Sequence, residues 1–490
     1  MRGRVVEIEA DVRPGLPGLL LTGLPDMALQ QARDRVRSAV VNVGERWPAH
    51  RVTVNLLPAS EPKQGTGFDL GIAFSIMCAS GAVPAGPVAD AAILGELALD
   101  GQVRPVRGVL PAVLAAAREG ITRVIVPVEN AREAALVPDV DVMAVDTLGR
   151  LLAYARGTGS LLPAPATEVR VEPLGLDLSD LVGQELGRRA VEVAAAGGHH
   201  LAMFGPPGAG KTMLAERLPG ILPALSDKAA LEVTAVHSVA GVLPANSPLL
   251  RRPPFQAPHH TTSAAALVGG GSGLARPGAL SLAHRGVLFL DEAPLFASRV
   301  LDTLRQPLES GLVRLPRSQG TAEYPAKVQL VIAANPCACA AGAVSCECGP
   351  AARRRYLARL SGPFLDRIDI QLSLESVTPA QLMLDGDSES SDRVAERVSR
   401  ARQAAAARWA GHDWCVNSEI PGRALRGPPW RLPVSVVRDL VRHVELGLLS
   451  ARGHDRVIRL AWTISDLEGH ERPDARDVGE AIHLRMRRAH

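Results

Sequence analysis

The segment GPPGAGKT at residues 205–212 has the residue types and the spacing of a loop that binds nucleotide phosphates. Its glycines carry no side chain that would keep backbone N–H groups away from phosphate oxygens. Lys211 can reach the outer phosphates with its charge, and the hydroxyl of Thr212 is a ligand for Mg²⁺. We therefore expect the chain to bind ATP together with Mg²⁺. The residues expected to contact the nucleotide are Gly205, Pro206, Pro207, Gly208, Ala209, Gly210, Lys211, Thr212 and Met213.

Polar residues that follow two other apolar runs suit the hydrolysis of that nucleotide. The run GVLFLDEA at 286–293 predicts a buried strand that ends in Asp291 and Glu292. Asp291 would coordinate Mg²⁺, and Glu292 would polarise the attacking water. The run VQLVIAAN at 328–335 ends in Asn335. The amide of Asn335 either holds that water near the γ-phosphate or only closes the strand by turn chemistry.

The elements next to the loop are those that a phosphate site needs. LAMF at 201–204 suits a buried strand, and residues 213–218 suit the helix that follows the loop. The N-terminus of that helix would face the phosphates with the positive end of its dipole.

Cysteines form the pattern C-x-C-x₆-C-x-C inside a loop rich in Gly and Ala, at Cys337, Cys339, Cys346 and Cys348. Four thiolates could close a tetrahedral Zn²⁺ site, which would serve structure because protein ligands would fill every position. The spacing is tighter than the usual C-x₂-C pairs, and four reduced thiols are the alternative.

The composition indicates a globular protein of about three domains, given 490 residues and the usual domain size. An apolar fraction of 47% supports sizeable cores, and an aromatic fraction of 3% means that aliphatic packing dominates. The net charge of +3 neither implies nor excludes nucleic acid as a partner. There is no apolar run of transmembrane length, no signal peptide before Arg2 and Arg4, and no disulfide scaffold. We therefore expect a cytoplasmic protein without membrane contact.

Changes of pattern along the chain predict its domain organisation. Residues 1–155 alternate short apolar runs with helical stretches, which is typical of an α/β domain. A linker with Gly, Pro and Thr follows at 156–175, and a second α/β domain at 176–375 contains the phosphate loop. A loop with an acidic, Ser-rich stretch at 376–392 leads to a helical domain at 393–490.

Segments spread over most of the chain carry a family resemblance. They are 183–223 (GQELGRRAVEVAAAGGHHLAMFGPPGAGKTMLAERLPGILP), 255–271 (FQAPHHTTSAAALVGGG), 277–294 (PGALSLAHRGVLFLDEAP), 331–339 (VIAANPCAC), 361–370 (SGPFLDRIDI) and 449–469 (LSARGHDRVIRLAWTISDLEG). The chain resembles the AAA+ ATPases, and within them the branch of magnesium-chelatase motor subunits, minichromosome maintenance helicases and ComM/YifB competence proteins. The match to the ComM/YifB family covers essentially the whole chain. It implies an α/β fold: an AAA+ P-loop core with a helical lid of the magnesium-chelatase C-terminal type.

The resemblance assigns roles to arginines. Arg367 in LDRID is similar to the arginine finger that each subunit inserts into the site of its neighbour, where it stabilises charge on the transferring phosphoryl group. The residues alone also allow a surface arginine paired with Asp366 or Asp369. Arg452 in SARGHDR looks like the second sensor, with Arg456 one turn further on as the alternative. These assignments imply a homo-oligomeric ring, which in this family is most often a hexamer.

Two stretches of the second α/β domain match inserts that touch the substrate in this branch. Residues 267–277 match its helix-2 insert, and residues 312–327 alternate like a hairpin that turns near Gln319 and Gly320. The resemblance implies that the charges of this hairpin line a central channel and track DNA phosphates. On the residues alone, an ordinary hairpin with solvated charges is the alternative. The expected DNA contacts are Arg314, Arg317 and Lys327.

The first domain resembles the proteolytic domain of Lon proteases over residues 62–76 and 99–136. That domain works with a Ser nucleophile activated by a Lys. Gly67 stands at the position of the Ser and Leu110 at that of the Lys, so we expect the fold without peptidase activity. Its expected use is oligomerisation or contact with nucleic acid. Family members usually carry an extra stretch before the equivalent of Val5, so we expect a first strand to be missing here.

The residues and the resemblance together favour one function and leave an alternative. The favoured function is a ring motor that tracks single-stranded or branched DNA and drives branch migration in homologous recombination, including natural transformation. The alternative is a chelatase-type motor that remodels a protein partner, although such a motor has no need of the Lon-like domain. The missing Ser and Lys argue against a peptidase, and the intact nucleotide residues argue against a non-catalytic scaffold.

Overall fold

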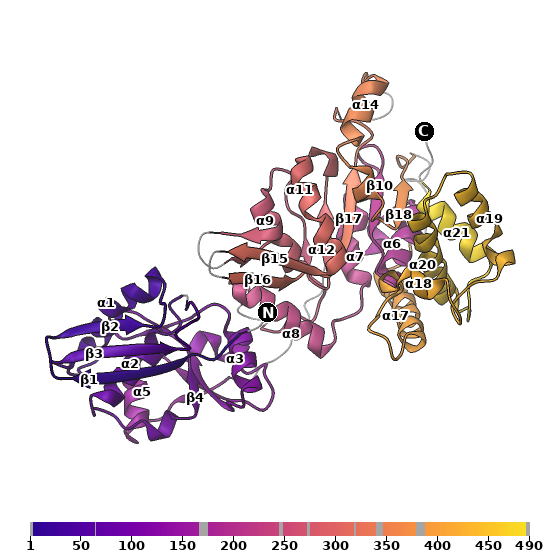
Figure 1. Cartoon of the computed structure of the whole chain (residues 1–490). Coiled ribbons are helices and arrows are strands. Elements are labelled where there is room, and N and C mark those ends of the chain that lie inside the picture. Colours follow the sequence, from indigo (N-terminus) through magenta and orange to yellow (C-terminus); the bar gives the residue numbers. More distant parts are fainter. Residues whose placement is uncertain are drawn as a thin grey trace.

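The structure is a computed structural model in which an N-terminal α/β domain, a central α/β domain and a C-terminal helical domain follow one another (Figure 1). Among the residues that it describes, none of the helices combines the length and the apolar character needed to cross a membrane. The described residues are 3–63, 65–165, 175–244, 248–271, 275–317, 320–339, 346–378 and 388–486.

The N-terminal domain begins with a small sheet covered by helices. Its elements are β1 (Glu7–Arg13), β2 (Gly18–Thr22), α1 (Met27–Asn42), β3 (Arg51–Leu57) and α2 (Asp69–Ala79). β3 lies between β1, to which it is antiparallel, and β2, to which it is parallel. Val52, Val54 and Leu56 of β3 are buried because alternate side chains of a strand share one face. They belong to one apolar core with residues of α1 and α2.

The second half of this domain carries a further sheet of strand order β4-β7-β8-β9. Its elements are β4 (Ala91–Ile93), β5 (Glu96–Leu97), β6 (Val103–Arg104), α3 (Val109–Arg118), β7 (Arg123–Pro127), α4 (Ala131–Ala134), β8 (Asp141–Val145), α5 (Leu148–Ala155) and β9 (Leu162–Pro163). β4, β7 and β8 are parallel, whereas β9 is antiparallel to β8. The stretch 156–175, expected to be a linker, therefore contains a strand of this sheet, and residues 166–174 of it lie outside the described ranges.

The central domain is built on a parallel sheet of strand order β11-β14-β17-β10-β18. Its strands are β10 (Leu201–Phe204), β11 (Phe255–Gln256), β14 (Val287–Leu290), β17 (Gln329–Ala334) and β18 (Ile370–Ser373). β10, β14 and β17 are buried along their whole length, as expected of apolar strands covered on both faces. Because the strands are parallel, the residues that follow β10, β14 and β17 meet at one edge of the sheet.

Helices surround this sheet and connect it to the first domain. They are α6 (Glu185–Gly197), α7 (Lys211–Ile221), α8 (Asp227–Ala240), α9 (Ala264–Val268), α10 (Ala279–Leu282), α11 (Ser298–Thr303), α12 (Arg305–Ser310), α14 (Pro350–Leu357) and α15 (Gly362–Leu365). α8 packs against α3 of the N-terminal domain, where Leu231 and Ala235 join an apolar cluster of that domain. The backbone N–H of Gly108 donates to the backbone oxygen of Ser238 at 3.2 Å. The two α/β domains therefore share a packed contact.

The central domain also has two short strand pairs, and Figure 1 shows one of them, labelled β15 and β16, on the side of the domain away from the lid. They are β12 (Gly269–Gly270) with β13 (Arg276–Pro277), and β15 (Leu312–Arg317) with β16 (Gly320–Pro325). Both pairs are antiparallel, as expected of the hairpin at 312–327. The hydroxyl of Tyr324 in β16 donates to the backbone oxygen of Ala275, so the two pairs are joined. Gln319 and residues 272–274 lie outside the described ranges.

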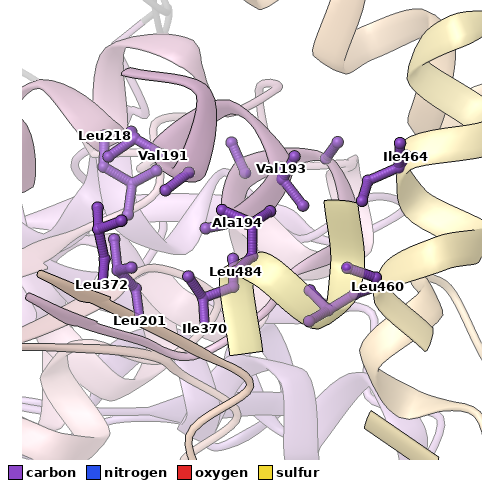
Figure 2. Packing of buried hydrophobic residues seen from close by; sticks show 14 of the residues in the cluster. Val191, Val193, Ala194, Leu201, Leu218, Ile370, Leu372, Leu460, Ile464 and Leu484 are labelled. Atoms are coloured by element: carbon purple, nitrogen blue, oxygen red, sulfur yellow. The ribbon is translucent and has the colours of Figure 1, made fainter. Parts of the chain in front are cut away.

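The C-terminal helical domain shares its core with the central domain (Figure 2). Its helices are α17 (Ser391–Arg408), α18 (Gly422–Leu425), α19 (Val434–Glu445), α20 (Ala451–Glu468) and α21 (Ala475–Arg485). Leu460 of α20 and Leu484 of α21 belong to the same buried cluster as Val193 and Ala194 of α6 and Ile370 of β18. Separating this lid from the sheet would expose these apolar side chains to water, which costs free energy.

Candidate functional site

The phosphate loop between β10 and α7 requires glycine for two different reasons. Gly210, the residue before α7, has φ = 79°, in the left-handed region that side chains disfavour. Gly205 is limited by space, because a Cβ there would lie 2.6 Å from the backbone oxygen of Leu374. A larger residue at either position would displace the backbone N–H groups that the loop offers to phosphate.

Lys211 lies largely buried inside this loop. Its ammonium group donates hydrogen bonds to the backbone oxygens of Gly205 and Pro206, both at 2.8 Å, and to Oδ1 of Asn335 at 3.0 Å. Burial lowers the pKa of Lys211 below its ordinary value, while the neighbouring carboxylates act in the opposite direction. A phosphate would compete with these oxygens for the same ammonium, so its binding is coupled to the position of Asn335 at the end of β17.

The hydroxyl of Thr212 and the carboxylate of Asp291 lie next to each other at this edge of the sheet. Oγ1 of Thr212 donates to Oδ2 of Asp291 at 3.0 Å. Adjacent oxygen ligands of an octahedral Mg²⁺ ion stand ~2.9 Å apart, so this pair of oxygens fits that ion. Thr212 and Asp291 would hold Mg²⁺, which when bound neutralises phosphate charge.

Glu292 follows Asp291 in an unusual backbone conformation. Its φ of 47° and ψ of 43° lie in the left-handed region, which costs about 1–3 kcal/mol for a residue other than glycine. The backbone N–H of Glu292 donates to Oδ1 of Asp291 at 2.8 Å. Strain of this kind collects at functional sites, where the surrounding structure maintains it.

Sequence reasoning missed two neighbours of these residues. Nδ1 of His260 lies 3.8 Å from Oε2 of Glu292. The hydroxyl of Tyr356 in α14 faces the backbone of Asn335, and burial together with the charge of Glu292 raises the pKa of Tyr356 to about 12. The signal for His260 was its place in the segment 255–271, whereas nothing in the sequence places Tyr356 here.

The chain matches family models of the magnesium chelatase subunit ChlI in three parts. Magnesium chelatase, subunit ChlI matches residues 177–382. Subunit ChlI of Mg-chelatase matches residues 8–130, and the magnesium chelatase subunit ChlI C-terminal model matches residues 388–485.

Relatives match over nearly the whole length. An uncharacterized protein of Mycobacterium tuberculosis (strain H37Rv) is 51% identical over 485 residues, covering 99% of this chain and 96% of the relative. The competence protein ComM of Haemophilus influenzae is 40% identical over 492 residues, covering 98% of this chain and 94% of ComM. The protein YifB of Escherichia coli is 39% identical over 485 residues, covering 98% of this chain and 94% of YifB.

This chain belongs to the ComM/YifB family. The family and the AAA+ fold expected from the sequence are therefore confirmed. These magnesium-chelatase-like AAA+ proteins use nucleotide and Mg²⁺.

The N-terminal domain of this ComM/YifB chain is similar to a different class of protein. The Lon protease of Rhizobium meliloti is 30% identical over 165 residues, which cover 31% of this chain and 20% of that protease. Leu110 is buried at the start of α3, where its backbone N–H donates to Glu133 at 2.8 Å. The backbone oxygen of Gly67 accepts a hydrogen bond from the backbone N–H of Gly95 at 3.0 Å. Neither residue can act as nucleophile or base, and the lack of peptidase activity stays a prediction.

Arg367 and Arg452 lie together in a pocket of about 200 Å³. Its lining residues, all outside the phosphate loop, are Glu309, Asp366, Arg367, Arg452, Asp455, Arg456 and Arg459. Arg367 donates to the backbone oxygen of Pro363 at 2.6 Å and pairs with Glu309 of α12, rather than with Asp366 or Asp369. The structure therefore places these two arginines in one pocket that no residue of the phosphate loop lines.

The two candidates for the second sensor, Arg452 and Arg456, differ in how firmly their side chains are held. The side chain of Arg452 is 72% exposed and stands 3.9 Å from Asp366. Arg456 pairs with Asp369, which is buried and also accepts the backbone N–H of His200 at 3.0 Å. Arg456 therefore holds α20 of the lid to the start of β18, whereas the side chain of Arg452 is free to take other positions.

Replacing Asp369 by asparagine should destabilise the chain by about 3–5 kcal/mol, because one partner of a buried ion pair is lost. Burial alone would raise the pKa of Asp369, but Arg456 and His199 hold it well below the ordinary value of 3.8. Since folding lowers this pKa, the contribution is fully present above pH 3.8 and is lost as the pH falls through the lowered pKa. Urea unfolding at neutral pH measures the effect.

The matched control is Asp302→Asn, which removes an exposed pair with Arg305 at 3.3 Å. Exposed ion pairs contribute little to the free energy of unfolding, so this variant should unfold at the same urea concentration as the native protein. Equal midpoints for Asp369→Asn and the native protein would contradict the role given to the buried pair.

Two of the three residues expected to contact DNA already have acidic partners. Nε of Arg314 in β15 lies 2.9 Å from Oε1 of Glu323 in β16. Nζ of Lys327 lies 3.1 Å from Oε1 of Glu419, a residue of the lid between α17 and α18. The side chain of Arg317, at the end of β15, lies outside what the structure describes.

The structure brings together Cys337, Cys339, Cys346 and Cys348, which we call the thiol cluster. Their sulfur atoms all lie within 4.8 Å of one another. All six cysteines of the chain lie in the described ranges, and none of them forms a disulfide.

Proposed function

We propose that this chain is the subunit of an ATP-driven ring that acts on DNA, as a branch-migration or helicase-like motor in homologous recombination. The first support is the division of the nucleotide residues. Lys211, Thr212 and Asp291 converge on one edge of the sheet, whereas Arg367 and Arg452 line a separate pocket. A head-to-tail ring brings such a pocket to the loop of the next subunit. The family is most often hexameric.

The observation that carries the DNA part is the hairpin β15–β16. It lies at the side of the central domain away from the lid (Figure 1), and it is supported by the strand pair β12–β13 through Tyr324 and Ala275. Arg314 is 60% exposed, so it can exchange Glu323 for a phosphate. Phosphate contacts of this kind follow the nucleic acid backbone without regard to sequence. The relative from Haemophilus influenzae is named a competence protein, and a motor that acts on DNA is compatible with that name.

The alternative is a motor that remodels a protein partner, as in a metal chelatase. The matching family models are named for a magnesium chelatase subunit, which favours this alternative. The model named for the chelatase subunit also matches residues 8–130, so the Lon-like N-terminal domain does not distinguish the two kinds of motor, and the DNA motor depends on the hairpin and on the relatives.

The rate of ATP hydrolysis should rise when single-stranded or forked DNA is added, and this stimulation should fall as salt is raised, because phosphate contacts release counterions. In the double variant Arg314→Ala, Arg317→Ala, the slope of log affinity against log salt should become shallower by about 2, about one for each lost phosphate contact. The measurements are a coupled ATPase assay and fluorescence anisotropy of labelled DNA over a salt series.

Arg438→Ala is the matched control, since it removes one exposed charge from α19 of the lid. Its slope should equal that of the native protein. Unchanged hydrolysis with every DNA tested would favour the protein-remodelling motor. A double variant with the native salt slope would contradict the role of the hairpin.

A further inference from the structure

We propose that the thiol cluster binds one structural Zn²⁺ ion through four thiolates and thereby fixes the connection between β17 and α14. This inference concerns the position of Asn335 in the nucleotide site and does not depend on DNA as the substrate. Each thiol gives up its proton to solvent when its sulfur binds the metal.

The distances between the sulfur atoms fit such an ion. Sγ of Cys337 lies 3.0 Å from Sγ of Cys339 and 3.2 Å from Sγ of Cys346, and the last two are 3.4 Å apart. In a tetrahedral site with Zn–S bonds of about 2.3 Å, neighbouring sulfurs stand ~3.8 Å apart. These three separations need to open by about 0.4–0.8 Å to admit the ion. The complete set of four sulfur donors favours Zn²⁺ over the oxygen-binding Mg²⁺.

The surroundings of the cluster supply a compensating charge. A Zn²⁺ ion with four thiolates has a net charge of −2, which needs a nearby cation or hydrogen-bond donors. Nη2 of Arg353 in α14 lies 3.4 Å from Sγ of Cys346 and donates to it. Cys337 is buried at one end of the cluster, whereas Cys339 is exposed, so the ion can enter from solvent.

The cluster lies between two parts of the nucleotide site. Cys337 follows Asn335 by two residues, and Asn335 accepts a hydrogen bond from Lys211. Cys348 precedes α14 by two residues, and the hydroxyl of Tyr356 in α14 faces the backbone of Asn335. A metal that joins both ends of the loop therefore limits the movement of Asn335. Figure 1 shows α14 standing beyond the end of β17, away from the rest of the sheet.

Metal analysis of the full-length protein, purified without chelators, should find one zinc ion per chain. X-ray absorption at the zinc edge should show four sulfur neighbours at about 2.3 Å. The double variant Cys339→Ser, Cys346→Ser should lose the zinc. Cys415→Ser, the matched control, changes an exposed cysteine outside the cluster and should retain it. Protein without zinc, iron in its place, or zinc retained in the double variant would overturn the proposal.

Two further measurements test the zinc site even if the double variant fails to fold. Cys339→His keeps a ligand that Zn²⁺ accepts and should retain the metal, while Arg353→Gln should bind it about 10- to 100-fold more weakly, as expected for a lost outer partner. Arg353, Arg354 and Arg355 are exposed in α14, so trypsin cleavage there reports on the loop. Removing zinc from the native protein with a mercurial reagent should accelerate this cleavage. An unchanged cleavage rate, or native affinity in Arg353→Gln, would contradict the proposed clamp.

Discussion

Arg367→Ala should lower ATP hydrolysis about a thousandfold or more, and mixing this variant with Lys211→Ala should restore it. Arg367 and Arg452 share one pocket, and its lining residues lie outside the phosphate loop of the same chain. In the proposed ring, the arginine that stabilises the transferring phosphoryl group would come from the neighbouring subunit. The nucleotide affinity of Arg367→Ala should stay close to that of the native protein, because the whole phosphate loop is intact.

The mixture provides the sharper test. A Lys211→Ala subunit cannot use its own site but still offers Arg367, and an Arg367→Ala subunit has the opposite defect. In a head-to-tail ring assembled at random from equal parts, half of the subunits have a working loop and half of their neighbours have a working arginine. About a quarter of the interfaces therefore combine both. If the sites act independently, hydrolysis should return to about a quarter of the native rate. Steady-state ATPase rates over a series of mixing ratios measure this.

Arg438→Ala is again the control, because it removes an arginine of α19 that the pocket does not contain. It should hydrolyse ATP at the native rate. Arg367→Ala with native turnover would show that the finger role is wrong. A mixture no more active than its two components, at concentrations where sizing shows mixed assemblies, would show that the site is complete within one chain.

Glu292→Gln should lower the rate of hydrolysis by about 10²- to 10⁴-fold and leave ATP affinity unchanged. Glu292 is the carboxylate at the end of β14 that neither binds Lys211 nor takes part in the pair of Thr212 and Asp291. An amide has the same shape but cannot accept a proton from water. The measurements are single-turnover hydrolysis and the titration of a fluorescent ATP analogue.

Asp291→Asn is the comparison that separates the two carboxylates. Its oxygen stands 3.0 Å from Thr212 and fits the Mg²⁺ position, so this variant should raise the Mg²⁺ concentration needed for nucleotide binding. Glu292→Gln should keep the native Mg²⁺ requirement. Native turnover in Glu292→Gln would remove its assigned role, and equal Mg²⁺ dependence in both variants would remove that of Asp291.

Several site residues could be predicted because they lie next to strong local patterns. The phosphate loop stands between an apolar strand and a helix, and Asp291 and Asn335 end apolar strands. In a parallel sheet the carboxyl ends of such strands meet, so local pattern and tertiary position agree. The short strand β9 was missed because a strand of two residues, Leu162 and Pro163, has no periodicity to read.

Other contacts had no local signal, because they join residues far apart in the chain. Tyr356 faces the backbone of Asn335 because the fold brings α14 back to the end of β17. Arg367 pairs with Glu309, 58 residues earlier, although Asp366 and Asp369 are its neighbours in sequence. A side chain at the end of a short helix pairs with the carboxylate that packing brings within reach, and sequence separation has no part in that choice.

The amino-acid order alone predicted the phosphate loop, the carboxylates and the family, because each depends on residue types at fixed spacing within short segments of the chain. Packing in three dimensions established which arginine of the lid is held by Asp369 and which is exposed, because Arg452 and Arg456 are one helical turn apart on α20. Packing also brought the four sulfurs of the thiol cluster within 4.8 Å of one another. Distances of this kind depend on how the whole chain fills space, and no short segment contains that information.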